Sequence, residues 1–525
     1  MKRSSALVRV GLATCLAAAI SFVLVSSGSP RTAGAATSPK HGGDLVFARA
    51  ADIFSLNPVK VTDDESIWTA ELLYGTLLEP STNGKTLVPW LATGYTVSKN
   101  HLVWTFTLRK GLRFSNGKPL TSADVKFSID QVGADPSNGF AFIDRAIKSI
   151  ATPTPYTVVV TTKYAWAPLL SDLALFANGI IPANYGGETE QQFFEHPISS
   201  GPFVVKKWVK GSYLDLVKNK YYWQKGKPYL DAVTIEDVPA SNTRQLQLQS
   251  GSADVIEDPS YSSISQLDHQ SGLTVDSFPS SYTEYMGMNE NVKPFQELAV
   301  RRAISYAIDR QAIVKAVLFG HGSAATGYMS PAEWAYDPKA PGIQYNLAMA
   351  KKAMSESTVP HGFSATLLIG SGNTTEETMG AIIQSELKPL GINVTLKVTD
   401  PNSEQTDIEK GHYDMGFQYT TTDIIDPDEM TSYTSMGGNY GQLAHTLWTN
   451  FNNVPTDKLG VEAEKTFNHA ERVKLYDEIQ VENDKEAVLA YLYYSPYIYG
   501  VSTKVHGLYI NPEGWYNLQN VWLGN

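Results

Sequence analysis

Residues Trp104–Val125 read WTFTLRKGLRFSNGKPLTSADV and predict a strand, a tight turn and a capped helix in direct succession. Apolar residues alternate with threonines over 104–108, the period-two pattern of a half-buried strand. The Asn-Gly pair at 116–117 supplies the turn, because both residues tolerate positive φ. Thr121 with Asp124 three residues later is a variant of the capping box that begins a helix. Alone, the stretch indicates a β-turn-α unit without chemistry.

Strand and helix patterns alternate along the rest of the chain. A strand is predicted at 45–48, and helices are predicted at 67–78, 299–318 and 379–390. The last of these stops at Gly391, a residue that commonly ends helices. This mixture indicates an α/β or α+β protein.

Length and charge narrow the class of protein. A chain of 525 residues has room for two to four domains. The content of 42% hydrophobic and 18% charged residues is ordinary for a soluble globular protein. The net charge of -11 argues against binding to nucleic acid or to an anionic membrane.

The first 35 residues have the pattern of a signal peptide. Basic residues precede an apolar run at 10–25, and Ala33-Gly34-Ala35 matches a cleavage site. We therefore expect an exported protein, in the periplasm or at the outer face of the cytoplasmic membrane. An uncleaved anchor is the alternative. Cys15 is the only cysteine and lies inside the apolar run, so the mature chain would carry no disulfide. Lipidation at Cys15 is less favoured, since Thr14 precedes it and more apolar residues follow.

The block at 104–125 closely resembles W-T-F-x-L-R-x-G-x-x-F-x-[ND]-G-x-P-x-x-x-x-D-V of the peptide-type (family 5) extracellular solute-binding proteins of ABC importers. Further blocks resemble the same family in the same order, at 87–92, 200–203, 219–223 and 301–310. The resemblance covers residues 42–510. It implies an α/β fold of two lobes that close on a ligand, the type II periplasmic-binding-protein clamshell, with an extra domain inserted in the first lobe.

The resemblance also implies domain boundaries. The signal peptide would occupy 1–35 and the inserted domain 80–198. Lobe II would occupy 286–498. Lobe I would combine three segments, 42–79, 199–285 and 499–525.

The best candidate for a binding site is the segment 419–428, which follows a predicted strand at 413–417. In peptide-binding relatives, an Asp three residues before an Asp-Pro pair holds the α-ammonium group of the ligand, and Asp423 matches that position. A buried ammonium needs such an ionic partner. Tyr419 is a shifted substitute for the aromatic residue that relatives carry nearby. Asp426 is a second candidate, although it could simply order the Asp-Pro bend.

Three aromatic residues complete the predicted ligand-binding set. Tyr493 and Tyr494 lie in a strand near the C-terminus that resembles the hinge-proximal strand of the family, and Trp448 lies in a lobe II loop. Each could equally be a buried core residue.

No Arg occurs between Arg310 and Arg472, although some peptide-binding relatives use a lobe II Arg to hold the ligand carboxylate. Lys397 or Lys410 could replace it. The ligand could therefore be a longer or capped peptide, and an oligosaccharide or a nickel or other metal chelate remains open.

No catalytic motif is present: the sequence lacks a nucleophile elbow, a Walker A loop and a His-Glu-x-x-His helix. Acidic pairs such as Asp63-Asp64 and Glu376-Glu377 are expected on solvated faces. The prediction is a monomeric, non-enzymatic binding protein without cofactor or metal, whose partners are its ligand and the permease subunits of an ABC importer. A secreted hydrolase using an acidic pair and a surface receptor without a transporter are the alternatives.

Overall fold

The computed structural model describes residues 38–437, 448–451 and 454–524. Residues 40–525 form one compact unit, and the described helices and strands belong to it. The predicted signal peptide and Cys15 lie outside the described residues. No described helix combines the length and the apolar character that crossing a bilayer requires.

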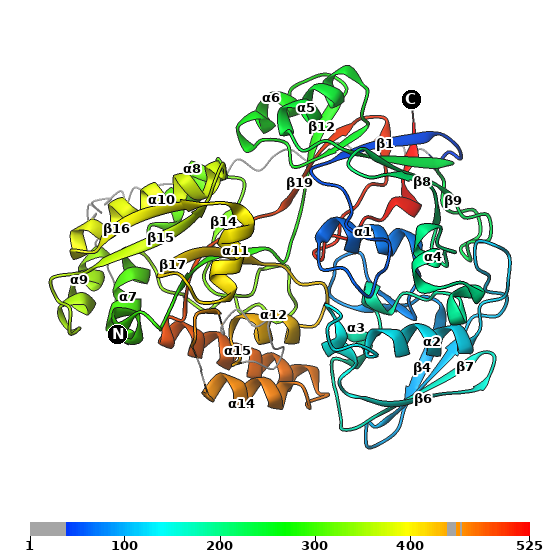
Figure 1. The fold of residues 1–525 in the computed structure, drawn as a ribbon, viewed down its shortest axis with the longest axis horizontal. Helices are drawn as coiled ribbons and strands as arrows, with labels where there is room; N and C mark the ends of the chain where they lie inside the picture. Colours follow the sequence, from blue (N-terminus) through cyan, green and yellow to red (C-terminus); the bar gives the residue numbers. More distant parts are fainter. Residues whose placement is uncertain (1–37, 438–447, 452–453, 525) are drawn as a thin grey trace, which may run out of the picture. The chain divides into compact units, whose positions relative to one another are not determined.

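A seven-stranded sheet with the order β12-β19-β11-β1-β10-β9-β8 forms one part of this unit (Figure 1). Its strands are β1 (Asp44–Arg49), β8 (Phe203–Val209), β9 (Tyr213–Lys218), β10 (Ala232–Asp237), β11 (Val255–Glu257), β12 (Leu273–Phe278) and β19 (Tyr497–Ser502). Phe47 of β1 packs with helix α1 (Asp64–Leu73). The next residue, Ala48, packs with helix α5 (Ser241–Ser250). The alternation of side chains along β1 thus buries both faces of the sheet.

A six-stranded sheet with the order β14-β18-β13-β17-β15-β16 forms a second part. Its strands are β13 (Thr283–Met288), β14 (Ser323–Ala324), β15 (Ser364–Gly370), β16 (Asn393–Thr399), β17 (Met415–Thr420) and β18 (Leu489–Tyr494). Helices that share its larger core are α7 (Leu298–Ala307), α8 (Arg310–Val317), α9 (Leu347–Ser355) and α10 (Thr374–Leu387). Helix α11 (Pro401–Glu409) packs through Ile408 on Leu368 of β15.

The chain crosses between the two sheets at two neighbouring segments. One runs from β12 to β13 through residues 279–282, and the other runs from β18 to β19 through Ser495 and Pro496. Ser280 donates a hydrogen bond from its hydroxyl to the carbonyl of Ser495, which ties the two segments together. The predicted lobe boundaries stay a prediction.

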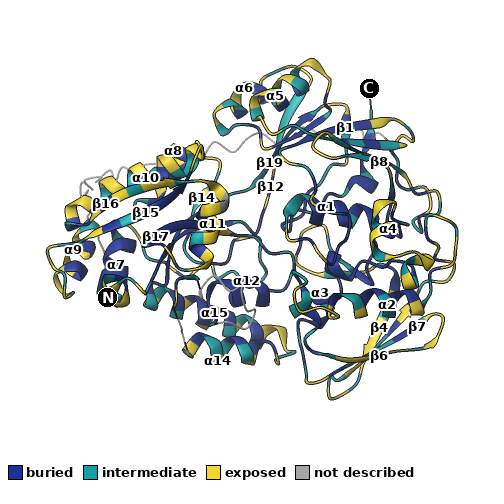
Figure 2. Ribbon diagram, in the orientation of Figure 1, coloured by how far each residue is buried: buried dark blue, intermediate teal, exposed yellow. Residues whose placement is uncertain are grey.

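The opening block 104–125 contributes one strand and the start of a helix to a separate four-stranded sheet with the order β4-β5-β7-β6. Its elements are β4 (Ala92–Val97), β5 (Val103–Leu108), β6 (Ile147–Thr154), β7 (Thr157–Thr162) and helix α2 (Ser122–Val132). Trp104 and Phe106 are buried with Val125 of α2. The backbone N–H of Thr121 donates to Asp124 Oδ2 over 2.8 Å, which confirms the predicted cap. Figure 2 shows exposed positions along the outer strands of this sheet.

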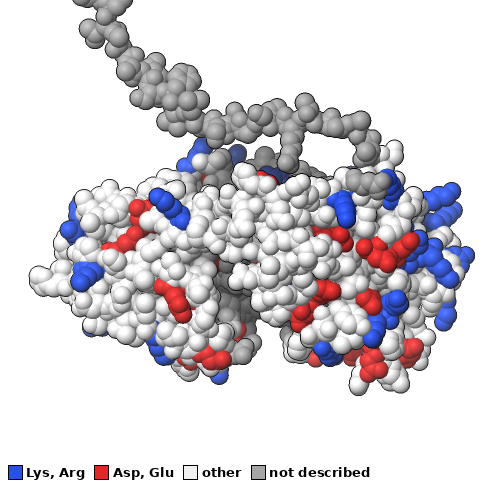
Figure 3. Space-filling view, turned by 90° about the horizontal axis from the view of Figure 1, so that it is seen from above, with Lys and Arg blue, Asp and Glu red and all other residues white. Residues whose placement is uncertain are grey.

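The remaining helices and short strands connect these sheets or cover them. They are β2 (Leu78–Pro80), β3 (Leu87–Pro89), α3 (Leu169–Asp172), α4 (Glu190–Glu195), α6 (Ile264–Asp268), α12 (Asp428–Thr434), α14 (Val454–Ala463), α15 (His469–Glu486), β20 (Val505–His506) and β21 (Trp522–Leu523). Every residue of α12 is buried, as Figure 2 also shows. Acidic and basic side chains are interspersed on the face seen in Figure 3.

Two predicted helices differ from the structure. The helix predicted at 299–318 is two helices, α7 and α8, because Asp309 takes an extended conformation and its carboxylate caps α8 by accepting the N–H groups of Gln311 and Ala312. The helix predicted at 67–78 ends at Leu73. The carbonyl of Leu73 accepts a hydrogen bond from the N–H of Gly201 over 2.8 Å. This distant residue therefore occupies the carbonyl that would otherwise bond to the next turn of the helix.

Candidate functional site

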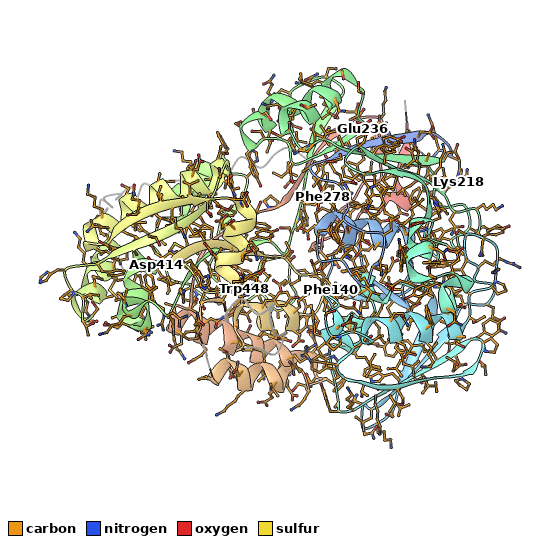
Figure 4. All side chains as sticks on the ribbon, in the orientation of Figure 1. Phe140, Lys218, Glu236, Phe278, Asp414 and Trp448 are labelled. Carbon is orange, nitrogen blue, oxygen red and sulfur yellow. The ribbon has the colours of Figure 1, made fainter. Side chains whose placement is uncertain are left out.

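A cavity of about 1060 Å³ is lined by residues from both large sheets and their helices. Trp68 of α1 and Tyr497 of β19 contribute from the seven-stranded sheet, and Glu284 of β13 and Tyr493 of β18 contribute from the six-stranded sheet. Its volume is at the upper end of the range of about 300–1,000 Å³ that is usual for small-molecule sites. Phe140 and Trp448, which also line it, are labelled in Figure 4.

The cavity wall is rich in acidic side chains. Seven of its side chains are carboxylic acids: Asp64, Glu257, Asp258, Glu284, Glu376, Glu404 and Asp423. Among the described residues that line it, none is Lys, Arg or His. A concave surface with charge of one sign focuses its field on the enclosed space. The cavity therefore favours a cationic group and disfavours an anionic one.

Aromatic rings form one part of the wall. Tyr282 stacks on Tyr419 with ring centroids 4.9 Å apart and an interplanar angle of 11°. Tyr282 also stacks on Tyr493, at 6.4 Å and 9°. The hydroxyl of Tyr282 donates to Glu284 Oε2 over 2.5 Å, which fixes the stack beside a carboxylate. Flat apolar faces next to polar groups suit an amphipathic ligand.

Asp423 lies just beyond the end of β17, in a backbone held by an internal carboxylate. The N–H groups of Asp423 and Ile424 both donate to Glu429 Oε2 over 2.9 Å. Glu429 is fully buried, and burial raises the pKa of its carboxyl to about 8. Burial and then the neighbouring Glu429 raise the pKa of Asp423 well above its ordinary value. None of the described residues donates a hydrogen bond to the Asp423 carboxylate.

A second carboxylate, Asp64 of α1, is electrostatically coupled to Asp423. Burial raises the pKa of Asp64 well above its ordinary value, and the charge of Asp423 is the next cause. Both carboxyls line the cavity, one from each large sheet's part of the wall. Their mutual repulsion would be relieved by a cation placed near them.

Four of the six predicted ligand-binding residues line the cavity: Asp423, Tyr419, Tyr493 and Trp448. Tyr494 lies outside the lining. Its hydroxyl accepts a hydrogen bond from the N–H of Gly327 and donates one to the carbonyl of Gly327, so the backbone of Gly327 holds it away from the cavity.

Asp426 also lies outside the lining. Its two carboxylate oxygens each accept a hydrogen bond from Arg472 over 2.7 Å. Both side chains are at least nine-tenths buried. This pair satisfies the charge of Asp426 internally, so we leave Asp426 and Tyr494 out of the proposed site.

The sequence pattern missed several acidic residues of the wall. The pair Glu376-Glu377 was expected on a solvated face, which is correct for the exposed Glu377 and wrong for Glu376, which lines the cavity. Asp64 differs from its expectation in the same way. Lys397 and Lys410 do not line the cavity, and Lys397 instead pairs with Asp407. Glu404 had no sequence signal, because only the fold brings it to this wall.

Comparison with known proteins identifies relatives along almost the whole chain. A family model described as bacterial extracellular solute-binding proteins, family 5 Middle, matches residues 86–442. The glutathione-binding protein GsiB of Salmonella paratyphi A is 29% identical over 489 residues, which are 90% of this chain and 92% of that protein.

Two solved structures with bound peptides are also similar. DppA of Helicobacter pylori, in complex with the peptide STSA, matches with a TM-score of 0.81 and 27% identity over 93% of this chain and 99% of that one. AppA of Bacillus subtilis, an oligopeptide-binding protein in complex with a nonapeptide, matches with a TM-score of 0.79 and 26% identity over 93% of this chain and 100% of that one. These matches confirm the predicted α/β fold of type II periplasmic binding proteins.

Proposed function

Because the chain belongs to family 5 of the bacterial extracellular solute-binding proteins, we propose that it captures peptides with a free amino terminus and delivers them to an ABC importer. It acts as an exported binding protein without catalytic activity of its own. The peptides bound to the Helicobacter and Bacillus proteins support this ligand class. The observation that carries the proposal is the Asp423 carboxylate, which lines the cavity without a hydrogen-bond donor among the described residues.

The α-ammonium of a peptide fits this carboxylate chemically. A buried charge is costly unless an opposite charge and hydrogen bonds satisfy it. An ammonium beside Asp423 would favour the ionised carboxylate and so reverse the effect of burial on its pKa. The same ammonium would offset the repulsion between Asp423 and Asp64. The two carboxyls thus give the amino end of a peptide a defined place.

The carboxyl end of the ligand has no such partner. No basic residue lies among the described residues of the lining, and the wall carries seven carboxylic acids. A free terminal carboxylate would meet repulsion there. Longer peptides or peptides with an amidated C-terminus therefore suit the cavity better than free dipeptides.

Ligand binding would also favour the closed conformation. Tyr419 belongs to β17 of the six-stranded sheet, and Asp423 lies just after that strand. Asp64 and Trp68 belong to α1 beside the seven-stranded sheet. A ligand that contacts both sets is bound most tightly in the conformation that offers both, so it shifts the population toward that state.

Isothermal titration calorimetry with tri-alanine amide and its N-acetylated form tests the proposal. Acetylation removes the ammonium charge, and hydrogen bonds to charged groups contribute about 1.5–3 kcal/mol. We expect acetylation to weaken binding by about 10- to 150-fold. Asp423→Asn should weaken binding of the free-amine peptide by a similar factor and leave the acetylated peptide unaffected. Glu377→Gln, which changes an exposed carboxylate outside the cavity, serves as the matched control.

The outcomes separate the alternatives. Equal affinity for the two peptides, or an unchanged affinity in Asp423→Asn, would overturn the role of Asp423. Binding of oligosaccharides or nickel chelates without any peptide binding would replace the ligand class. Mass spectrometry of the peptide after titration covers the hydrolase alternative, because a shortened peptide would show catalysis and an intact one supports a binding protein.

A further inference from the structure

Two parallel strands bring the beginnings of helices α10 and α11 together. β15 and β16 run in register, with Gly370 paired to Thr399 at their carboxyl ends. α10 begins at Thr374, and α11 begins at Pro401. The carboxyl ends of parallel strands share one edge of a sheet, the edge where α/β proteins bind their ligands. Acidic residues in the first turns of both helices therefore meet at this edge.

Glu376 of α10 is held in place by two hydrogen bonds from its surroundings. Its Oε2 accepts the N–H of Gly370 over 2.7 Å, and its Oε1 accepts the side-chain amide of Asn373 over 2.7 Å. Asn373 is also the N-cap of α10. The positive end of the helix dipole adds to these bonds.

Glu404 of α11 lies against this carboxylate. A Cβ atom at Gly370 would lie 2.6 Å from Glu404 Oε2 and 3.4 Å from Glu376 Oε2, so the missing side chain of Gly370 is what leaves room for both groups. Glu404 is 8% exposed, and its Oε1 has no hydrogen-bond partner among the described residues. Burial, then the charge of Glu376 and a hydrogen bond between the two side chains, raise the pKa of Glu404 to about 8.

The surrounding wall adds another acidic side chain, and its described lining residues include no cation. Glu284 of β13 has its pKa raised to about 8 by burial, and Glu376 and Glu404 are among the further causes, so the three carboxyls share one part of the cavity. Lys397 of β16 is paired with Asp407 and does not line the cavity. Glu404 thus lines a large cavity with no cation among the described lining residues, and a cationic group of the ligand could supply one.

We propose that Glu376 and Glu404 form a subsite for a cationic side chain of the ligand, an ammonium or a guanidinium, distinct from the place of the α-ammonium at Asp423. The protein then prefers peptides that contain Lys or Arg. This inference rests on the proposed function, because it assigns a second contact to the same bound peptide.

An organic cation fits this pair better than a metal ion does. No group of three or more His, Cys, Asp or Glu side chains that could hold a metal occurs in the described part of the chain. Two adjacent carboxyl groups, once a bound cation has displaced the proton of Glu404, match the donor geometry of a guanidinium or an ammonium. The aromatic stack of Tyr493, Tyr282 and Tyr419 can pack against the apolar stem of a Lys or Arg side chain.

Calorimetry with matched peptides tests the subsite. Three tripeptide amides carry Lys at position one, two or three, and each has a counterpart with norleucine, which keeps the stem and lacks the ammonium. We expect at least one Lys peptide to bind about tenfold or more tightly than its counterpart. Glu404→Gln and Glu376→Gln should remove this advantage and leave the norleucine peptides unchanged. Glu377→Gln should keep it.

Proton release provides a second readout that a purely structural role would not change. Burial raises the pKa of Glu404 to about 8, so we expect Glu404 to be mostly protonated at pH 7 before a ligand binds. A bound ammonium favours the ionised form of Glu404. Binding of the preferred Lys peptide should therefore release a proton from Glu404, and binding of its norleucine counterpart should not. Titrations in buffers of different ionisation enthalpy measure this release, and Glu404→Gln should abolish it.

The results distinguish this inference from the proposed function. Binding of all norleucine peptides without any preference for Lys would overturn the subsite and leave the peptide function intact. A preference for Lys that survives both substitutions would place the cation elsewhere and would also overturn it. If no peptide binds, the proposed function is wrong and the subsite is wrong with it. Should Glu376→Gln not fold, Glu404→Gln decides the question alone.

Discussion

Replacing Arg472 with methionine is expected to lower the free energy of unfolding by about 3–5 kcal/mol, because it leaves the Asp426 carboxylate buried without its cation. Arg472 donates to both oxygens of Asp426 over 2.7 Å, to the hydroxyl of Tyr476 over 2.8 Å and to the carbonyl of Ala463 over 3.0 Å. The exposed fractions of the two charged side chains are 8% and 6%. A surface ion pair would contribute less than about 1 kcal/mol, so the predicted loss follows from burial.

Urea unfolding followed by circular dichroism measures this loss as a fall in the midpoint at an unchanged slope. The double variant Arg472→Met with Asp426→Leu should recover most of the stability, because it removes both charges and leaves neither unpaired. Ligand affinity of Arg472→Met, measured well below its unfolding transition, should stay within about threefold of the original. A loss of stability below about 1 kcal/mol would refute the argument from burial. A large loss of affinity without a loss of stability would return Asp426 to the ligand site.

Two further predictions concern Gly370 and Glu333. Gly370→Ala should push Glu404 away from Glu376, because the added Cβ would lie 2.6 Å from Glu404 Oε2. Calorimetry should then show that the preference for Lys peptides is lost while the Tm of the protein is unchanged. A retained preference would contradict the assigned geometry. Burial raises the pKa of Glu333 to about 8, whereas the pKa of a Glu in the unfolded chain is near 4.3. At a pH between these two pKa values, folding takes up a proton. The free energy of unfolding therefore falls as the pH rises from about 5 to 8. Glu333→Gln should reduce that fall by about 1 kcal/mol or more, as measured by urea unfolding at both pH values, and an unchanged fall would show that Glu333 is ionised in the folded protein.

Local sequence was enough wherever neighbouring residues decide the structure. The block 104–125 folds as predicted because its alternation, its Asn-Gly turn and its capping residues all act within a few positions of one another. Prediction failed where a distant group intervened. The helix at 67–78 ends at Leu73, whose carbonyl bonds to Gly201, and nothing in the sequence near Leu73 reports that contact.

The binding residues divide in the same way. The resemblance of the sequence to the family pointed to Asp423, Tyr419 and Tyr493 as ligand contacts, and all three line the cavity. It ranked Asp423 ahead of Asp426, which lies three positions later in the same motif, but it could not show which groups either carboxylate contacts.

Only the tertiary structure assigned their partners. Arg472, 46 residues beyond Asp426, takes up one carboxylate and leaves the other facing the cavity. In the same way, the pairing of β15 with β16 brings Glu376 and Glu404 together at Gly370. The physical reason is that the state of a buried carboxylate depends on the charges and donors within a few ångströms, and long-range strand and helix contacts determine which residues those are.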